Sequence, residues 1–145
     1  MKPKVYLDNC CYNRPYDDQT QTRIKEETQA KMSIQRAIIN GGLDLVTSTI
    51  LYYENSRNDC WEARETIEEF MVHNEREYIS MESEAVKEIQ KRVMKTGLKF
   101  YDSYHVACAL CSSFDFFITV DDRILKRKFD SIEIVDPIQF LTKWR

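Results

Sequence analysis

Acidic residues stand at or near the ends of several predicted strands and helices. Asp8 directly follows a short apolar run, and Asp121 directly follows the run FFITV. Asp102 lies in the first turn of a predicted helix, and Glu54 lies about a turn and a half into another. Ligands bind at the carboxyl ends of parallel strands, where the order of the chain reverses. We therefore expect these four carboxylates to converge if the first and fourth strands are neighbours.

Carboxylates at close range repel one another, and this repulsion raises their pKa values unless a cation neutralises it. Oxygen ligands alone favour Mg²⁺ or Mn²⁺ over Zn²⁺. The pattern therefore predicts a divalent metal site, with Asp122 in reserve because it follows the same strand as Asp121. Each acid also has a simpler interpretation when taken alone. An Asp such as Asp102 at a helix start usually caps that helix, and a Glu on a helix is usually solvated.

An alternation of strands and helices must position these acids. Strands are predicted at 4–7, 43–48, 77–81, 116–120 and 132–135. Helices are predicted at 18–39, 50–54, 59–73, 82–95, 100–113 and 137–144, with at least one helical turn within 121–129. Turn residues dominate the segment 9–18, so a turn is expected there. This order predicts an α/β fold, a three-layer α/β/α sandwich with a central parallel sheet of about five strands, as one domain over residues 1–145.

The composition of the 145 residues is that of a soluble globular protein, with 43% hydrophobic and 31% charged residues. No window approaches the roughly 18 apolar residues of a membrane span, and the first residues do not resemble a secretion signal. A cytoplasmic protein is therefore expected, and its five cysteines are expected to be thiols. The net charge of -3 argues against a protein that binds nucleic acid over its whole surface. It does not argue against a nuclease, because active-site carboxylates contribute to that charge.

The motifs that carry the acids resemble, in order, those of PIN-domain nucleases. The first motif, YLDN, carries Asp8, and the second, STILYYEN, carries Glu54. The third, DSYHVACA, begins with Asp102, and the fourth, ITVDD, supplies Thr119 and Asp121. The tail IVDPIQFL is also similar to the closing strand and helix of the family. One departure follows the first acid, where Asn-Cys-Cys stands in place of the small hydroxyl residue of many members.

The resemblance implies a PIN-like fold and a Mg²⁺- or Mn²⁺-dependent endoribonuclease that hydrolyses RNA phosphodiester bonds. It implies metal-binding and catalytic roles for Asp8, Glu54, Asp102 and Asp121, with Asn9 and Thr119 in support. Toxins of toxin-antitoxin pairs belong to this family, so an antitoxin partner and a homodimer are also expected. His105 is interpreted as a buried or half-buried structural residue.

The most basic stretch of the chain directly follows the fourth motif. Its position makes it a candidate phosphate contact, although a solvated face is an equally good interpretation. The predicted substrate contacts are Arg14, Arg123, Lys126 and Arg127, with Lys95 and Lys99 as further candidates. Tyrosines predicted near the same edge of the sheet and able to stack on unpaired bases are Tyr12, Tyr16, Tyr52 and Tyr53. Core packing is the better interpretation for at least one of the last two.

Other classes of protein remain as alternatives. A catalytically silent PIN-like module that binds RNA or another protein would keep the same motifs. A haloacid-dehalogenase-like phosphatase requires an Asp two residues after the first, where this chain has Cys10. A receiver domain fits worse as well, because the predicted third strand ends in Ser80 and Met81 without an acid.

Overall fold

A five-stranded parallel sheet forms the centre of the computed structural model, which describes residues 2–112 and 114–144. Its strands are β1 (Lys4–Leu7), β2 (Asp44–Ser48), β3 (Glu75–Ile79), β4 (Phe116–Ile118) and β5 (Glu133–Val135). Their order across the sheet is β3-β2-β1-β4-β5. In the register of the central strand, Tyr6 lies opposite Val46 on one side and Phe117 on the other. The predicted parallel sheet is confirmed, and strands one and four are neighbours, which is the condition for the acids that follow them to lie close together.

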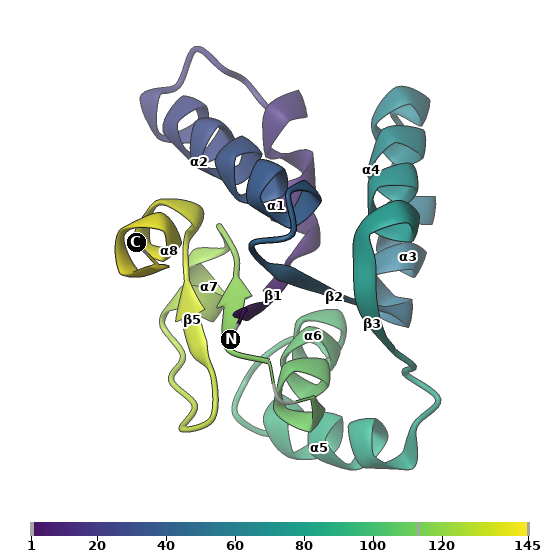
Figure 1. Cartoon of the computed structure of the whole chain (residues 1–145). Coiled ribbons are helices and arrows are strands. Elements are labelled where there is room, and N and C mark those ends of the chain that lie inside the picture. The colour runs from purple at the N-terminus through teal and green to yellow at the C-terminus, as the bar shows by residue number, and fades with distance from the viewer. Residues whose placement is uncertain (1, 113, 145) are drawn as a thin grey trace.

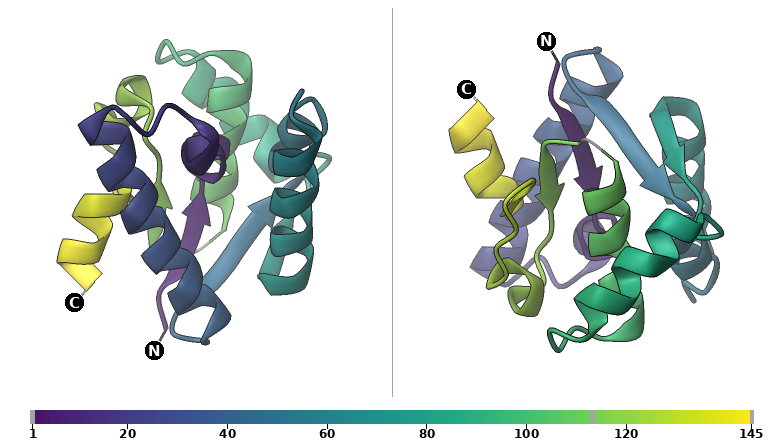
Figure 2. Two further views of the ribbon diagram at one scale, coloured as in Figure 1. Left: turned by 90° about the horizontal axis from the view of Figure 1, so that it is seen from above. Right: turned by 90° about the horizontal axis from the view of Figure 1, so that it is seen from below.

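Helices cover both faces of the sheet, as predicted. They are α1 (Asn9–Asn13), α2 (Thr22–Ile39), α3 (Thr49–Ser56), α4 (Trp61–Asn74), α5 (Glu84–Met94), α6 (Phe100–Cys111), α7 (Asp122–Leu125) and α8 (Pro137–Trp144), with a 3-10 turn η1 (Arg14–Tyr16). Helices α2 and α4 lie on one face, and α5 and α6 lie on the other (Figures 1 and 2). Helix α8 packs beside α2. Among the described residues, no helix is both long and apolar enough to cross a membrane.

The core lies on both faces of the two central strands. Parallel strands covered by helices on both faces have continuous apolar runs, and the run Val5 to Leu7 in β1 is fully buried. Phe117 and Ile118 of the neighbouring β4 are fully buried too. The small residues Ala107 and Ala109 allow α6 to approach the sheet closely, and both are buried. This packing fixes the carboxyl ends of β1 and β4 beside each other.

The prediction of a turn over residues 9–18 is wrong, because α1 and η1 occupy most of this segment. The carboxylate of Asp8 caps α1 by accepting a hydrogen bond from the backbone N–H of Asn9. Cys11 and Tyr12 of α1 are buried in the core. Burial therefore overrides the weak helix propensity of Asn, Cys and Tyr, and only the segment after η1 remains a turn.

Other predicted boundaries differ by a few residues. Strand β3 begins at Glu75 and ends before Ser80, two residues earlier than predicted. The hydroxyl groups of Thr47 and Tyr52 donate hydrogen bonds to the carboxylate of Glu75, which fixes the start of this strand. Helix α6 ends at Cys111, and Ser113, the predicted last residue of this helix, lies outside the described residues.

Candidate active site

The first and fourth acids follow adjacent strands. Asp8 comes directly after β1, and its backbone N–H donates to the carbonyl of Ile118 in β4 at 2.9 Å. Asp121 follows the extended end of the same β4 and caps α7 through the backbone N–H of Arg123. The chain order reverses between these two strands, which is where open parallel sheets bind ligands.

The carboxylate of Asp8 is buried and held by several donors. One oxygen accepts from the N–H of Asn9 at 2.8 Å, and the other accepts from the hydroxyl of Thr119 at 2.8 Å. The thiol of Cys10 lies 3.4 Å from that second oxygen and 3.3 Å from the Thr119 hydroxyl. These contacts fix the direction in which the Asp8 carboxylate points.

A buried chain of polar side chains connects β1 to Glu54. The hydroxyl of Tyr6 lies 2.6 Å from the hydroxyl of Ser48, the cap of α3, and 2.6 Å from Nδ1 of His105. The other ring nitrogen of His105 is hydrogen-bonded to the carboxylate of Glu54. It also lies 3.7 Å from Asp8 Oδ1. His105 therefore lies between two of the predicted metal ligands.

The charges of the site determine the protonation of His105. Burial lowers the pKa of the imidazole, because a charged ring loses its hydration. The negative charges of Asp8 and Glu54 outweigh burial and raise the pKa of His105 above its ordinary value. Whenever the ring is protonated, its charge offsets part of the negative charge of both carboxylates.

Arg123 connects the remaining two acids. Its guanidinium donates to both oxygens of Asp121, with the shorter contact at 2.8 Å, and lies 3.6 Å from Asp102. These hydrogen bonds lower the pKa of Asp121. The pKa of Asp102 is raised, first by burial and then by the charges of Asp8 and Asp121. Negative charge is therefore in excess around Asp102.

The donor set fits a divalent cation. Carboxylate oxygens of Asp8 and Glu54 lie within 4.8 Å of each other, and a ring nitrogen of His105 lies within the same distance of both. Burial and the charges of Asp8 and Asp121 raise the pKa of Asp102, and a nearby cation would favour its charged form. Most of the donors are carboxylate oxygens, which suit Mg²⁺ and Mn²⁺.

Asp122, the alternative candidate for the fourth acid, pairs with a side chain of another helix. Its carboxylate forms a bidentate ion pair with Arg23 of α2, with N–O distances of 2.8 and 3.1 Å. Its neighbour Asp121 lies instead with Arg123 and Asp102. The geometry therefore favours Asp121 over Asp122 as the metal ligand.

Replacing the two neighbouring acids separately tests this choice. We expect Asp121→Asn to weaken Mn²⁺ binding at least about tenfold, because it removes a ligand oxygen. Asp122→Asn should leave Mn²⁺ affinity within about twofold of the wild type, because only an exposed ion pair is lost. Isothermal titration calorimetry measures both affinities. Equal losses in the two variants would contradict the assignment.

The predicted substrate residues fall into two groups. A pocket beside Asp102 is lined by Gly97, Leu98, Lys99, Asp102, Arg123, Lys126 and Arg127. Within it, Arg127 donates to the carbonyl of Thr96 at 2.7 Å. Arg14 lies elsewhere, with its guanidinium 2.8 Å from Glu27 and 3.0 Å from Asp17. The structure thus brings Arg123, Lys126 and Arg127 together and engages Arg14 in ion pairs.

The tyrosines predicted to stack on bases differ in their exposure to solvent. Tyr12 is buried, so its predicted contact with bases is wrong. Tyr52 is half-buried and donates to Glu75, whereas Tyr16 and Tyr53 are exposed. The ring of Tyr53 lies 5.6 Å from the ring of Tyr101, the residue before Asp102.

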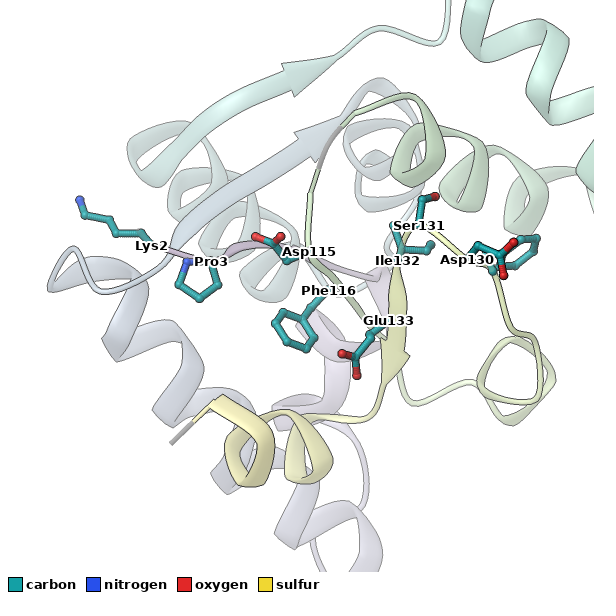
Figure 3. Close-up of a pocket in the computed structure, with 9 residues that line it drawn as sticks. Lys2, Pro3, Asp115, Phe116, Asp130, Ser131, Ile132 and Glu133 are labelled. Atoms are coloured by element: carbon teal, nitrogen blue, oxygen red, sulfur yellow. The ribbon is translucent and has the colours of Figure 1, made fainter.

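A further pocket lies away from these acids. It measures about 600 Å³ and is lined by residues that include Lys2, Pro3, Asp115, Phe116, Asp130, Ser131, Ile132 and Glu133 (Figure 3). Phe116 and Glu133 begin β4 and β5, so this pocket is at the amino ends of the strands. Open parallel sheets bind their ligands at the opposite ends, and we assign this pocket no role in the site.

Sequence reasoning left two residues outside the site that the structure places within it. His105 is buried and hydrogen-bonded, as expected of a structural residue, but the sequence did not indicate that its neighbours are Glu54 and Asp8. Its spacing of three residues from Asp102, which puts both on one helix face, is the signal that could have identified it. Cys10 contacts Asp8, and the sequence carried no comparable signal for this residue.

Comparisons with known proteins agree with this fold. A solved structure, the crystal structure of VapBC2 from Rickettsia felis bound to a DNA fragment from their promoter, is similar with a TM-score of 0.53. The match has 13% sequence identity and covers 90% of this chain and 96% of that chain, so it supports the fold alone. No curated protein matches the sequence. The PIN domain family model matches residues 22–130, which include three of the four acids. The chain therefore belongs to the PIN domain family.

Proposed function

We propose that the chain is a Mg²⁺- or Mn²⁺-dependent endoribonuclease that hydrolyses RNA phosphodiester bonds. The observation that supports this proposal most strongly is the grouping of Asp8, Glu54 and His105 beside the switch point between β1 and β4. Asp102 is close enough to Asp8 and Asp121 for their charges to raise its pKa. The four acids come from four separate segments of the chain, so the fold and not the local sequence sets their positions. PIN domains are in general nucleases, which agrees with this chemistry.

Each acid has a role in the proposal. Asp8, Glu54, Asp102 and Asp121 would hold the metal, which supplies activation of the attacking water and charge neutralisation at the leaving oxygen. Thr119 fixes the Asp8 carboxylate by its hydroxyl. Asn9 does the same by its backbone N–H.

His105 is a positioning residue in this proposal. It orients Glu54 by a hydrogen bond, and Tyr6 holds the imidazole from the other side. Side chains that hydrogen-bond to a metal ligand, without contacting the metal, set the orientation of that ligand. Because Tyr6 and His105 are both buried, the direction of Glu54 is set by the core and not by a mobile surface side chain.

The proposed partners follow from the family and from the similar structure. We propose that the chain acts in the cytoplasm as the toxin of a toxin-antitoxin pair, because the similar structure is a VapBC assembly. We further propose a homodimer. Size-exclusion chromatography with light scattering measures the oligomeric state of the purified chain, and a monomer at micromolar concentration would contradict the dimer.

The test of the nuclease is metal titration together with RNA cleavage on the same samples. Mn²⁺ is titrated into metal-free protein in a calorimeter, and cleavage of a labelled single-stranded RNA is followed with Mg²⁺, with Mn²⁺ and with EDTA. We expect saturable binding and cleavage that EDTA abolishes. Absence of binding at millimolar metal would show that the carboxylates do not form a metal site.

A second candidate function is a catalytically silent RNA-binding or protein-interaction module. It is favoured by Arg123, whose guanidinium contacts both Asp121 and Asp102 and supplies positive charge without a metal. In this case RNA or protein binding would persist in EDTA without any cleavage. The cleavage assay therefore separates the two functions.

A lysine of the basic pocket provides a prediction about substrate binding. Lys126 is exposed and lines the pocket beside Asp102, whereas the nearby exposed Lys128 does not line it. We expect Lys126→Ala to raise KM for RNA several-fold with little change in kcat, because a phosphate contact is lost. Lys128→Ala is the matched control and should leave KM unchanged. Equal KM values for both variants would show that Lys126 does not contact the RNA.

A further inference from the structure

A small pocket on the face of the sheet that carries α2 and α4 has a buried lysine in its wall. The pocket measures about 110 Å³, and α1 lies between α2 and α4 here (Figure 2, left). Lys31 of α2 and Tyr12 of α1 line it, with relative exposures of only 5% and 1%. A lysine is almost never buried to this extent unless it is paired.

Neither the ammonium group of Lys31 nor the hydroxyl of Tyr12 has an oxygen or nitrogen partner among the described residues. Within the described residues, the ammonium group of Lys31 contacts no oxygen acceptor, and its nearest polar partner is the sulfur of Met32 at 4.0 Å. It lies 5.6 Å from the centre of the Tyr12 ring, which gives a weak cation-π contact. The buried hydroxyl of Tyr12 has no hydrogen-bond partner in that part of the chain. A buried cation without an oxygen acceptor among the described residues therefore belongs to the wall of this pocket.

Glu27, one helical turn before Lys31 in α2, does not supply this acceptor. Glu27 is buried as well, but one carboxylate oxygen is 2.8 Å from Arg14 and the other is 3.2 Å from Arg23. Both oxygens are thus directed to arginines. The ion pairs of this helix leave Lys31 as the buried cation without a counter-charge among the described residues.

We propose that this pocket receives the carboxylate of an Asp or Glu side chain from a protein partner. A buried ammonium without a counter-charge is unfavourable, and an incoming carboxylate would pair with Lys31. The pocket is smaller than the roughly 300–1,000 Å³ of small-molecule sites, so a side chain fits it better than a nucleotide.

The rim of the pocket defines the rest of the partner. Met32 and Tyr16 line it and are exposed by 41% and 47%. Apolar side chains on either side of the incoming acid would cover them. The partner segment is therefore an acidic residue flanked by apolar residues. The proposed antitoxin is one protein that can carry such a segment, and to that extent the inference rests on the proposed function.

Selection of displayed random peptides on the intact chain tests the inference. We expect the wild type to enrich peptides with Asp or Glu at one fixed position and apolar residues beside it. Lys31→Met should lose this preference, whereas Lys25→Met, at an exposed lysine of the same helix, should keep it. For one selected peptide, Lys31→Met or replacement of the peptide acid by its amide should weaken binding about 30-fold.

A second variant and an independent assay keep the result unambiguous. Tyr12→Phe removes only a hydroxyl that the protein encloses and should leave the affinity for the same peptide unchanged, which separates the role of Lys31 from a general change of the pocket wall. Peptides without an acidic preference, or an unchanged affinity in Lys31→Met, would overturn the inference. Loss of the proposed nuclease would show instead as absence of RNA cleavage by the wild type, with peptide selection intact.

Discussion

Asp8→Asn is expected to abolish metal-dependent RNA cleavage, with a fall in rate of roughly 10²–10⁴-fold, the range for loss of a positioned catalytic group. The substitution keeps the shape of the side chain but replaces a charged ligand oxygen with an amide. In the wild type this carboxylate accepts hydrogen bonds from Asn9 and Thr119, so its geometry is fixed before any metal binds. We also expect Mn²⁺ affinity to fall at least about tenfold.

The control for this experiment is an acid away from the site. Asp44 begins β2, at the opposite ends of the strands, and its nearest cation is Arg76 at 4.0 Å. Asp44→Asn should leave both Mn²⁺ binding and cleavage unchanged. Thermal unfolding followed by circular dichroism establishes that both variants are folded. Wild-type cleavage by folded Asp8→Asn would exclude this carboxylate from the metal site.

The central sheet could be predicted because its strands are short, apolar and buried on both faces. The run at Val5 to Leu7 and the run at Phe116 to Ile118 form strands as expected, and the structure shows that these strands are neighbours. The acids that follow them could be selected because their place at strand ends distinguishes them from surface Glu and Asp. The preference for Asp121 over Asp122 in the sequence agrees with the geometry, since Arg23 pairs with the second of the two.

Features that depend on contacts between distant segments could not be predicted. Helix α1 forms from residues of weak helix propensity because Cys11 and Tyr12 are buried. The contact of His105 with Glu54 joins residues far apart in the chain, and the α6 pattern alone indicated only that the imidazole is buried or half-buried. Lys31 and Glu27 in the polar pattern of α2 gave no sign that both are buried.

Lys31→Met is expected to increase the free energy of unfolding by roughly 1–3 kcal/mol at pH 7, because it removes a buried charge without a carboxylate partner. Methionine has a similar length and fills the same space without a charge. Urea denaturation measures the change. Lys25→Met, at an exposed position of the same helix, should change the free energy of unfolding by less than about 0.5 kcal/mol.

The pH dependence of the difference in free energy of unfolding between Lys31→Met and the wild type tests whether the buried charge causes it. Burial lowers the pKa of Lys31 from 10.5 to about 8. Between these values the unfolded chain holds a proton on Lys31 and the folded chain does not, so the free energy of unfolding rises with pH. Across the whole window this gain amounts to at most about 3 kcal/mol. Lys31→Met has no ammonium group at this position and does not gain this stability. Its excess in free energy of unfolding over the wild type should therefore shrink from pH 8 to pH 10.5. A constant difference across this range would mean that the ammonium group already has a counter-charge in the folded chain.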